Sequence, residues 1–375
     1  MDLKGGTERD LYQTAEGLRD RGHQVHLFCS EYGVPAPSDT VAHNIPVIPM
    51  GRTLRLWSFA LLAPRIIKRH GCDVVVGFGR LLSQDVLRSG GGTHRDFLLR
   101  MAQQGGPVRK IWHYLSLYHQ SLLQIEKRQF SDRRLMRVIA VSDEVRRDIE
   151  SNYPIAHDRI SVLYNGVDQQ RFHPSRRISM RDRVRARWRV PDEAHLVLFV
   201  GSGFLRKGLD RLIAIWNRPH LSRVFLMVAG DDGRIGYYKN WAHAVAGERI
   251  LFVGRQDDIE NYYASADLVA LPAVQEAFGN VVLESLASGV PVVVSREVGA
   301  GAILTGCLRR GVVEKAEDPN QLEAGLIAML EECLKPNFRA AARQLGENYS
   351  WKSHFQRLEA LLDEVIHGRG GTRVP

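Results

Sequence analysis

The chain has 375 residues, of which 44% are hydrophobic, and its mean hydropathy is −0.21. This length suits two α/β domains of ordinary size, and no apolar run reaches the roughly 18 residues that a membrane-spanning helix needs. The net charge of +9 is uneven, because residues 51–137 carry 16 Lys and Arg against 5 Asp and Glu; such a basic field suggests a polyanionic partner, namely nucleic acid, anionic lipid or a phosphorylated glycolipid.

The number and spacing of the cysteines indicate the cellular compartment in which the protein folds. Four cysteines are present, and their spacing fits neither a metal site nor a redox motif. We read them as reduced thiols, which is typical of a cytoplasmic protein.

A glycine turn lies at the start of the chain. Gly5 and Gly6 lead into a predicted helix, and the strand Val25 to Ser30 follows. In a doubly wound domain such a turn follows a central strand, but only Met1 to Lys4 precede it here. A typical strand has about five or six residues, so we expect the first strand to be missing and the native product to begin upstream of Met1.

The next candidate is a histidine after a glycine-rich loop. The buried-type strand Asp73 to Phe78 is followed by a loop that ends in Gly90-Gly91-Gly92-Thr93-His94. A histidine donor beside a developing charge is chemically sensible. A lone histidine is as often an ordinary loop residue, and both interpretations stay open on these residues alone.

Residues 97–130 mix apolar, aromatic and basic side chains. Trp112, Tyr114 and Tyr118 alternate with Arg109 and Lys110 on a predicted helical stretch. This composition suits the interface of an anionic membrane, and a helix that packs its aromatic residues inward explains it equally well. Nucleic-acid binding is the weaker interpretation, because no nucleic-acid motif accompanies the basic residues.

The second half opens with a glycine-rich turn that carries two cations. The core strand Leu196 to Val200 is followed by Gly201, Gly203, Arg206 and Lys207. An arginine next to a lysine suits a diphosphate, one as a planar fork and the other as a point charge. A dinucleotide fingerprint is rejected, because arginine stands where the third glycine belongs and no acidic residue ends a strand about 20 positions later.

Two further loops follow predicted strands. Asp231 and Asp232 come after the strand Val224 to Ala229 and fit either a metal-binding pair or a turn. The strand Ile250 to Val253 ends in Gly254-Arg255.

Two carboxylates dominate the stretch LPAVQEAFGNVVLESLASGVP at residues 271–291. Glu276 and Glu284 stand eight positions apart, in a strand–loop–helix–strand pattern. The helix start near Gly279 offers unpaired N–H groups to an anion. The separation of the two carboxylates along the chain does not by itself exclude a catalytic pair of a glycosidase. An interpretation in which both bind one extended ligand, one at each end, is simpler. Two solvated surface glutamates remain the alternative.

These residues resemble a known family. The spacing of Glu276 and Glu284 within EAFGNVVLE, followed by ASGVPVV, is similar to the signature of the retaining glycosyltransferases of family 4, which have the GT-B fold. The segment from Val162 to Pro174 and the cations after Gly203 are similar to that family as well. The resemblance covers about residues 5–366.

The resemblance implies an α/β fold of two Rossmann-like, doubly wound domains that face a cleft. Residues 1–168 would form an acceptor-binding domain without its first strand, and residues 169–350 a nucleotide-sugar-binding domain. Residues 351–367 would form a helix that crosses back to the first domain. Residues 368–375 would be a disordered tail.

The resemblance also implies site roles. Glu276 would bind the hexose hydroxyls of the donor, Glu284 the ribose, and Arg206 with Lys207 the diphosphate. His94 would sit against the reacting sugar, and no metal is expected. The implied catalytic residues are His94, Glu276, Arg206 and Lys207; the implied donor-binding residues are Gly5, Gly6, Gly203, Arg206, Lys207, Arg255, Glu276, Phe278, Gly279, Asn280 and Glu284.

The expected function is hexose transfer with retention. Within the family the chain is most similar to the transferases that move glucose from UDP-glucose to the lipopolysaccharide core, so a glycolipid acceptor and an anionic inner-membrane surface, contacted through residues 97–130, are the expected partners. The protein would be cytoplasmic and peripheral on that membrane. Another family-4 donor, GDP-mannose or UDP-galactose, is the first alternative. A non-catalytic basic protein that binds nucleic acid is the second.

Overall fold

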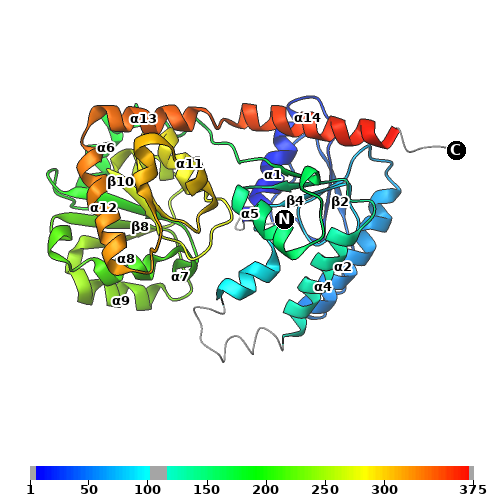
Figure 1. The fold of residues 1–375 in the computed structure, drawn as a ribbon, viewed down its shortest axis with the longest axis horizontal. Helices are drawn as coiled ribbons and strands as arrows, with labels where there is room; N and C mark the ends of the chain where they lie inside the picture. Colours follow the sequence, from blue (N-terminus) through cyan, green and yellow to red (C-terminus); the bar gives the residue numbers. More distant parts are fainter. Residues whose placement is uncertain (1–5, 102–115, 371–375) are drawn as a thin grey trace. The chain divides into compact units, whose positions relative to one another are not determined.

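The computed structural model describes residues 6–101 and 116–370. The chain divides into two compact units: residues up to Tyr164 together with those from Lys352 onward form the first, and Asn165–Trp351 forms the second. Each unit contains parallel β-sheet covered by helices (Figure 1). The helices of the described residues include none long and apolar enough to cross a membrane.

The second unit is built on one six-stranded parallel sheet in the order β12-β11-β10-β7-β8-β9. Most residues of its inner strands are buried on both faces, as for the runs HLVLFV of β7 and VVVS of β11. Continuous apolar runs of this kind are what a parallel sheet needs when helices cover both faces. The strands are β7 (His195–Val200), β8 (Val224–Ala229), β9 (Ile250–Gly254), β10 (Leu268–Leu271), β11 (Val292–Ser295) and β12 (Val312–Val313).

Helices alternate with these strands along the chain, and they pack in pairs such as α6 with α10 and α11 with α13. Figure 1 shows them surrounding the strands of the unit. The helices are α6 (Arg176–Arg187), α7 (Phe204–Lys207), α8 (Leu209–Ile215), α9 (Ile235–Ala246), α10 (Ile259–Ser265), α11 (Asn280–Ala287), α12 (Pro319–Cys333) and α13 (Pro336–Glu347).

A buried ion cluster fastens α6 to this sheet. Asp267, at the start of β10, accepts hydrogen bonds from Nη2 of the fully buried Arg185 at 2.6 Å and from Nη2 of Arg177 at 2.8 Å. It also accepts the backbone N–H of Leu196 at 3.0 Å. Burial raises the pKa of Asp267, but the charge of Arg185 and these hydrogen bonds outweigh burial, so the net pKa lies below its usual value. The carboxylate therefore stays charged and paired.

The first unit contains two separate parallel sheets among the described residues. One pairs β1 (His26–Cys29) with β2 (Val41–Asn44), and the other has the order β3-β4-β5-β6. The strands of the second sheet are β3 (Val76–Gly77), β4 (Val86–Ser89), β5 (Arg137–Ala140) and β6 (Ile160–Val162); the helices are α1 (Gly6–Arg19), α2 (Gly51–Lys68), α4 (Leu117–Ser131), α5 (Asp143–Asn152) and α14 (Trp351–Gly370).

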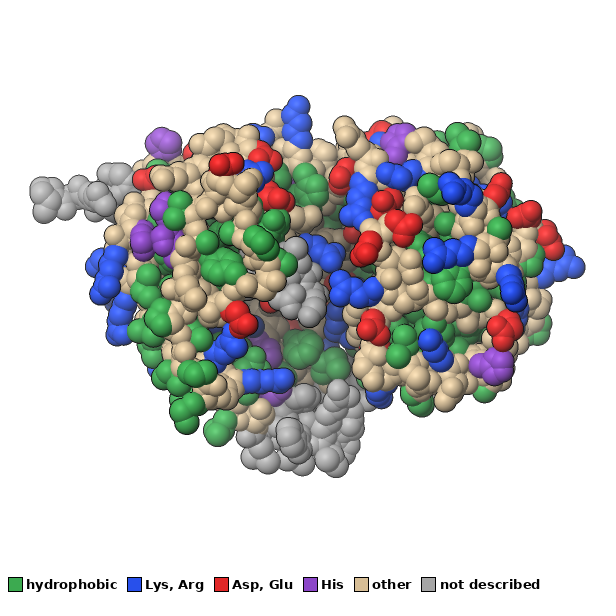
Figure 2. Space-filling model, turned by 180° about the vertical axis from the view of Figure 1, so that it is seen from behind, with side chains coloured by type: hydrophobic (Ala, Val, Ile, Leu, Met, Phe, Trp, Pro, Cys, Tyr) green, Lys and Arg blue, Asp and Glu red, His purple; other side chains and the backbone are tan. Residues whose placement is uncertain are grey.

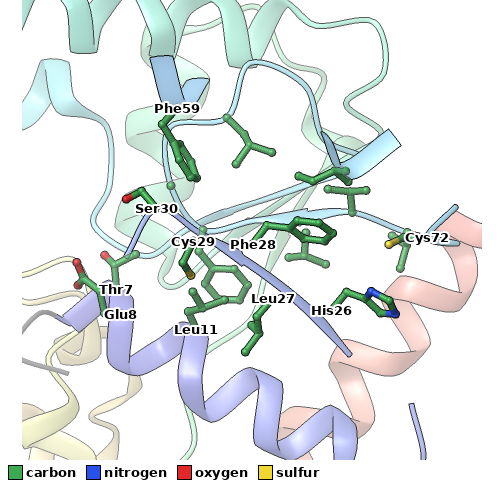
Figure 3. A pocket seen from close by; sticks show the side chains of 17 residues that line it. Thr7, Glu8, Leu11, His26, Leu27, Phe28, Cys29, Ser30, Phe59 and Cys72 are labelled. Atoms are coloured by element: carbon green, nitrogen blue, oxygen red, sulfur yellow. The ribbon is translucent and has the colours of Figure 1, made fainter. Parts of the chain in front are cut away.

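A cavity of about 290 Å³ lies where β1 and β3 border the gap between these two sheets (Figure 3). Its lining includes Leu27 and Phe28 of β1, Val75 and Val76 at the start of β3, and Leu11 of α1. The missing strand that we expect ahead of Gly5 concerns residues outside the described ranges, so that expectation stays a prediction. Among the described residues, no strand pairs with both β1 and β3, so the two sheets are not joined by backbone hydrogen bonds there.

The last helix, α14, packs on the first unit. Nε2 of His23 lies 2.9 Å from Oε1 of Glu359, Arg21 pairs with the same carboxylate, and the ring of Phe355 lies where a side chain on Gly17 would be. The helix continues to Gly370, three residues beyond the predicted end at His367. Residues 368–370 of the expected tail are therefore helical, and residues 371–375 lie outside the described ranges.

The change from one unit to the other falls between Tyr164 and Asn165, four residues before the expected boundary at Asp168. Two contacts explain the difference. Nδ2 of Asn165 donates to Oδ1 of Asn280 at 2.7 Å, and the backbone N–H of Val167 donates to Tyr349 at 2.9 Å. Both contacts bind these residues to the second unit.

Candidate active site

The loops that follow β7 and β10 meet at one point of the second sheet. These strands are neighbours, yet β7 continues along the chain to β8 on one side while β10 continues to β11 on the other. This arrangement is a topological switch point, and open α/β sheets bind ligands at the carboxyl ends of the strands beside it. The loop after β7 carries Arg206 and Lys207, and the loop after β10 carries Glu276.

Glu276 binds both cations. Its Oε2 lies 2.9 Å from Nη1 of Arg206 and 2.9 Å from Nζ of Lys207. The side chains of Glu276 and Lys207 are 17% and 12% exposed, whereas that of Arg206 is 35% exposed. Two adjacent cations and a carboxylate 70 positions after Arg206 therefore form one ion cluster, whose formal charges sum to about +1.

The pKa of Glu276 follows from this cluster. Burial raises the pKa of the carboxyl, but the charges of Lys207 and Arg206 and their hydrogen bonds lower it by more, so the net pKa lies below the usual value. The carboxylate is therefore ionised at neutral pH and accepts hydrogen bonds only. An ionised acceptor of this kind suits sugar hydroxyls.

The backbone of the loop after β7 leaves space for the side chain of Lys207. Gly201 has φ of +145°, and a Cβ built there would lie 2.4 Å from Cδ of Lys207. Only glycine leaves room for the lysine side chain to pass back toward Glu276. The carbonyl of Arg206 accepts the backbone N–H of Val274 at 2.8 Å, so backbone also joins the two loops.

The loop around Glu276 is fastened to the segment after β11. The N–H of Glu276 donates to Glu297 at 3.1 Å, and its carbonyl accepts the N–H of Gly299 at 2.9 Å. The carbonyl of Phe278 accepts the N–H of Ala300 at 2.7 Å. Gly279 then turns the chain into α11 with φ of +96°, a left-handed conformation that glycine adopts without strain.

The second carboxylate of the stretch is held separately. Oε2 of Glu284, in α11, accepts the hydroxyl of Tyr263 at 2.6 Å. Burial, followed by the charge of Glu284, raises the pKa of Tyr263 well above its usual value, so the phenol remains a donor. The expected donor-binding residue Asn280 is exposed at the start of the same helix.

The remaining candidates of this unit lie at the same edge of the sheet. Gly203 precedes α7, and Arg255 directly follows β9 with an exposed side chain. Asp232 accepts the N–H of Phe204 at 2.9 Å and that of Arg234 at 2.9 Å. Asp232 therefore shapes the loops here, in agreement with the turn that its sequence context favours.

The candidates of the first unit cannot all be placed. Gly5 lies outside the described residues, and Gly6 is the first residue of α1. His94 is 9% exposed, its backbone N–H donates to Oε2 of Glu126 at 2.7 Å, and its Nε2 lies 3.1 Å from Nδ1 of His119. Glu126 is itself buried and pairs with Arg80 at 2.8 Å. The His94 loop is thus anchored to α4.

Sequence analysis missed several residues that hold this site. Tyr263 orients Glu284, Asn165 contacts Asn280, and Glu126 anchors the His94 loop. Asn165 stands in the segment from Val162 to Pro174 that resembles the family, but its contact with Asn280 cannot be read from the sequence. Tyr263 and Glu126 belong to no motif named above, because each acts through a partner that is distant in sequence. The one available signal for Glu126 was that it is the single acidic residue of its helix.

Positive charge at the switch point suits a diphosphate, and the adjoining carboxylate suits the hydroxyls of a sugar attached to it. Two Rossmann-like units with this site define a nucleotide-sugar-dependent glycosyltransferase of the GT-B fold. The profile of Glycosyltransferase Family 4 matches residues 4–171, and that of Glycosyl transferases group 1 matches residues 180–348. The chain belongs to glycosyltransferase family 4, a family of retaining enzymes, and the resemblance found in the sequence is confirmed.

Several relatives place the chain within this family. It is 25% identical over 298 residues to the lipopolysaccharide glucosyltransferase WaaG of Escherichia coli, covering 79% of this chain and 78% of WaaG. It is 30% identical to a probable transglycosylase of Burkholderia thailandensis over 79% of this chain and 75% of the relative. The crystal structure of WaaG matches with a TM-score of 0.79 at 23% identity over 96% of both chains. Anabaena HepE, solved with UDP and glucose, matches with a TM-score of 0.65 at 19% identity over 96% of both chains.

Replacing Gly201 with alanine should lower kcat/KM for the nucleotide sugar by about ten- to a hundredfold, because small misplacements of a catalytic group have effects of that size. The added Cβ would push Lys207 away from Glu276. Gly247→Ala is the matched control, since Gly247 also has a positive φ, of +58°, and a Cβ there meets nothing within 4 Å. Steady-state kinetics measure the effect, and thermal melting checks that both variants fold. A folded Gly201→Ala variant with wild-type kcat/KM would contradict this role for Lys207.

Proposed function

We propose that the chain transfers glucose from UDP-glucose, with retention, to a lipopolysaccharide core or a related glycolipid. The observation that carries the proposal is the contact of Arg206 and Lys207 with Glu276 at the switch point of the second unit. The similarity to WaaG, a lipopolysaccharide glucosyltransferase, and to HepE, solved with UDP and glucose, supports glucose and uridine over other donors.

In this proposal the ion cluster is rearranged by the donor. The diphosphate binds Arg206 and Lys207 in place of Glu276. In the structure, Oε2 of Glu276 lies 2.9 Å from a nitrogen of each cation. Glu276 is then released to accept hydroxyls of the hexose. Phosphate oxygens are strong partners for a guanidinium, so the exchange replaces one set of charge-assisted hydrogen bonds with another.

The other donor-binding residues are assigned from the diphosphate outward to the ribose and the base. Backbone N–H groups of Phe278, Gly279 and Asn280 at the start of α11 would face the diphosphate. Glu284 would accept ribose hydroxyls while Tyr263 fixes its second oxygen. Arg255 would lie against the base, and Gly203 and the glycine turn at Gly5 and Gly6 would let backbone approach the phosphates.

The chemical step needs no protein nucleophile. The bond from the anomeric carbon to the diphosphate oxygen breaks, and the acceptor oxygen bonds to that carbon on the same face. The departing diphosphate oxygen takes the acceptor proton. Arg206 and Lys207 stabilise the negative charge that develops on the leaving group, so these cations supply the positive charge that a metal would otherwise provide.

His94 completes the proposed catalytic set. Its backbone is held by Glu126 and its ring stacks on Phe97, with centroids 5.8 Å apart. A fixed imidazole can donate a hydrogen bond to the reacting hexose. The expected effect of His94→Ala is on kcat rather than on UDP affinity.

A donor panel tests the proposed function. The purified chain is incubated with UDP-glucose, UDP-galactose or GDP-mannose, with and without a bacterial glycolipid extract, and release of free nucleoside diphosphate is measured. UDP-glucose with extract should give the highest rate. A preference for another donor would replace glucose with that sugar. No release from any donor would favour a non-catalytic protein. On the face that Figure 2 shows, the second unit presents basic side chains interspersed with acidic ones.

The two glutamates should separate kinetically. Glu284→Ala should weaken UDP binding about ten- to a hundredfold, the range for losing a hydrogen bond to a charged group. Glu276→Ala should lower kcat while leaving UDP affinity equal or higher, because it frees Arg206 and Lys207 for the diphosphate.

Calorimetric titration with UDP and steady-state kinetics measure both effects. Glu248→Ala, with a side chain 90% exposed on the same unit, is the control. Equal losses of UDP affinity at the two positions would overturn the assignment of hexose and ribose.

The basic, aromatic stretch 97–130 is proposed to contact an anionic membrane that holds the acceptor. Residues 102–115 of this stretch, with Trp112, Arg109 and Lys110, lie outside the described ranges. In the described part, Leu117 begins α4 with 78% of its surface exposed. Sedimentation with phosphatidylglycerol vesicles should show binding that falls as salt rises. Binding no greater than to phosphatidylcholine vesicles would contradict the proposal.

A further inference from the structure

Three histidine rings converge on one point of the first unit. His26 begins β1, His43 lies in β2, and His70 follows α2. One ring nitrogen from each histidine can be chosen so that the three nitrogens all lie within 4.8 Å of one another. Among the described residues, no other group of three or more His, Cys, Asp or Glu side chains has this geometry.

Strand pairing fixes two of the three rings. β1 and β2 are parallel, with His26 opposite Val41 and Phe28 opposite His43. Side chains two positions apart on a strand share a face, so His26, Phe28 and His43 project from the same side of this sheet. Nδ1 of His26 lies 2.9 Å from Nε2 of His43. Both side chains are half-buried, whereas His70 is exposed.

The third ring, that of His70, reaches the other two from just beyond the end of α2. The ring of His70 lies with its centroid 4.1 Å from that of His43 and 6.1 Å from that of His26. Phe28 stacks on His43 with centroids 4.5 Å apart and packs against His70 at 5.3 Å. The aromatic ring thus supports two of the imidazoles and restricts their motion.

This arrangement fits the requirements of a metal ion. Zinc binds imidazole nitrogen at about 2.0–2.1 Å, which sets the nitrogens of a tetrahedral site about 3.4 Å apart. The separations here, from 2.9 Å to at most 4.8 Å, lie around that value, so modest ring rotation suffices. Imidazole is the ligand type that divalent transition metals such as zinc, copper and nickel favour.

A simpler interpretation of the same contacts needs no ion. The three rings would then be ordinary aromatic packing around a hydrogen-bonded pair of histidines, and this is the alternative that an experiment must exclude.

We propose that His26, His43 and His70 bind one divalent transition-metal ion, tested here as zinc, and that the ion links β1, β2 and the end of α2. Three protein ligands leave a position for water. The site is structural, because its residues lie in the first unit and none takes part in the proposed transfer chemistry. The ion would stabilise the sheet formed by β1 and β2, which has only these two strands among the described residues.

Calorimetric titration tests binding directly. The full chain, stripped of metal with a chelator and dialysed, is titrated with zinc chloride. The wild type should bind about one equivalent, and His70→Ala should bind at least about tenfold more weakly, since even the loss of a group that only supports a ligand has effects of that order. His157→Ala is the control, because this histidine is in the same unit with a side chain 74% exposed. Absence of a saturable site, or equal affinity in His70→Ala, would overturn the proposal.

Thermal melting provides a second measurement that does not depend on catalysis. Zinc that binds only the folded chain raises its stability, so zinc should raise the Tm of the wild type and of His157→Ala. The same concentration should leave the Tm of His70→Ala nearly unchanged. Since His70 is exposed, its replacement spares the core, and similar Tm values without zinc verify this. Equal shifts in all three proteins would place zinc elsewhere and contradict the assignment.

Discussion

The contact of one carboxylate with two cations holds the second unit's site together. A half-buried Glu276 without partners would lose hydration without compensation, but Arg206 and Lys207 satisfy it and keep it ionised. The same contact ties the loop after β7 to the loop after β10, across the point where the chain changes direction in the sheet. A ligand that binds here must offer those cations a better partner than the carboxylate does. In the proposed function a diphosphate meets that condition and its sugar binds the carboxylate that is released, so one ion cluster would select for a sugar diphosphate.

The composition of this cluster could be predicted from sequence, whereas its assembly could not. Arg206 and Lys207 after a glycine-rich strand end, and Glu276 and Glu284 around a helix start, are local patterns that carry their chemistry in a few residues. The contact between Arg206 and Glu276 depends on β10 lying beside β7, which no local pattern encodes. The hydrogen bond from Tyr263 to Glu284 and the cluster of His26, His43 and His70 depend likewise on tertiary structure.

The two-domain α/β class was predictable because apolar, strand-like runs alternate with predicted helices along a chain of this length. The GT-B fold was implied by the resemblance of EAFGNVVLE and ASGVPVV to family 4. Boundaries were less accurate. Asn165 and Val167 belong to the second unit through side-chain and backbone partners that lie more than 100 residues later in the chain. The end of α14 at Gly370 lies beyond the glycine at 368, which local propensity would treat as a stop. At the unit boundary, contacts distant in sequence decide where Asn165 and Val167 belong. At the end of α14, the continuity of a long helix outweighs the tendency of Gly368 to end it.

The division of the first unit into two sheets has a consequence for how it unfolds. No backbone ladder joins β1 and β2 to the other strands among the described residues; side chains do, through a small core of Ile45, Ala63, Ile67 and Leu81. A cooperative unit is only as large as the contacts that couple its parts. We therefore expect the piece formed by β1, β2 and α2 to open at a lower free energy than the six-stranded sheet of the second unit. Its amide hydrogens should exchange through local opening, while those of β7 and β8 should exchange only when their whole unit unfolds.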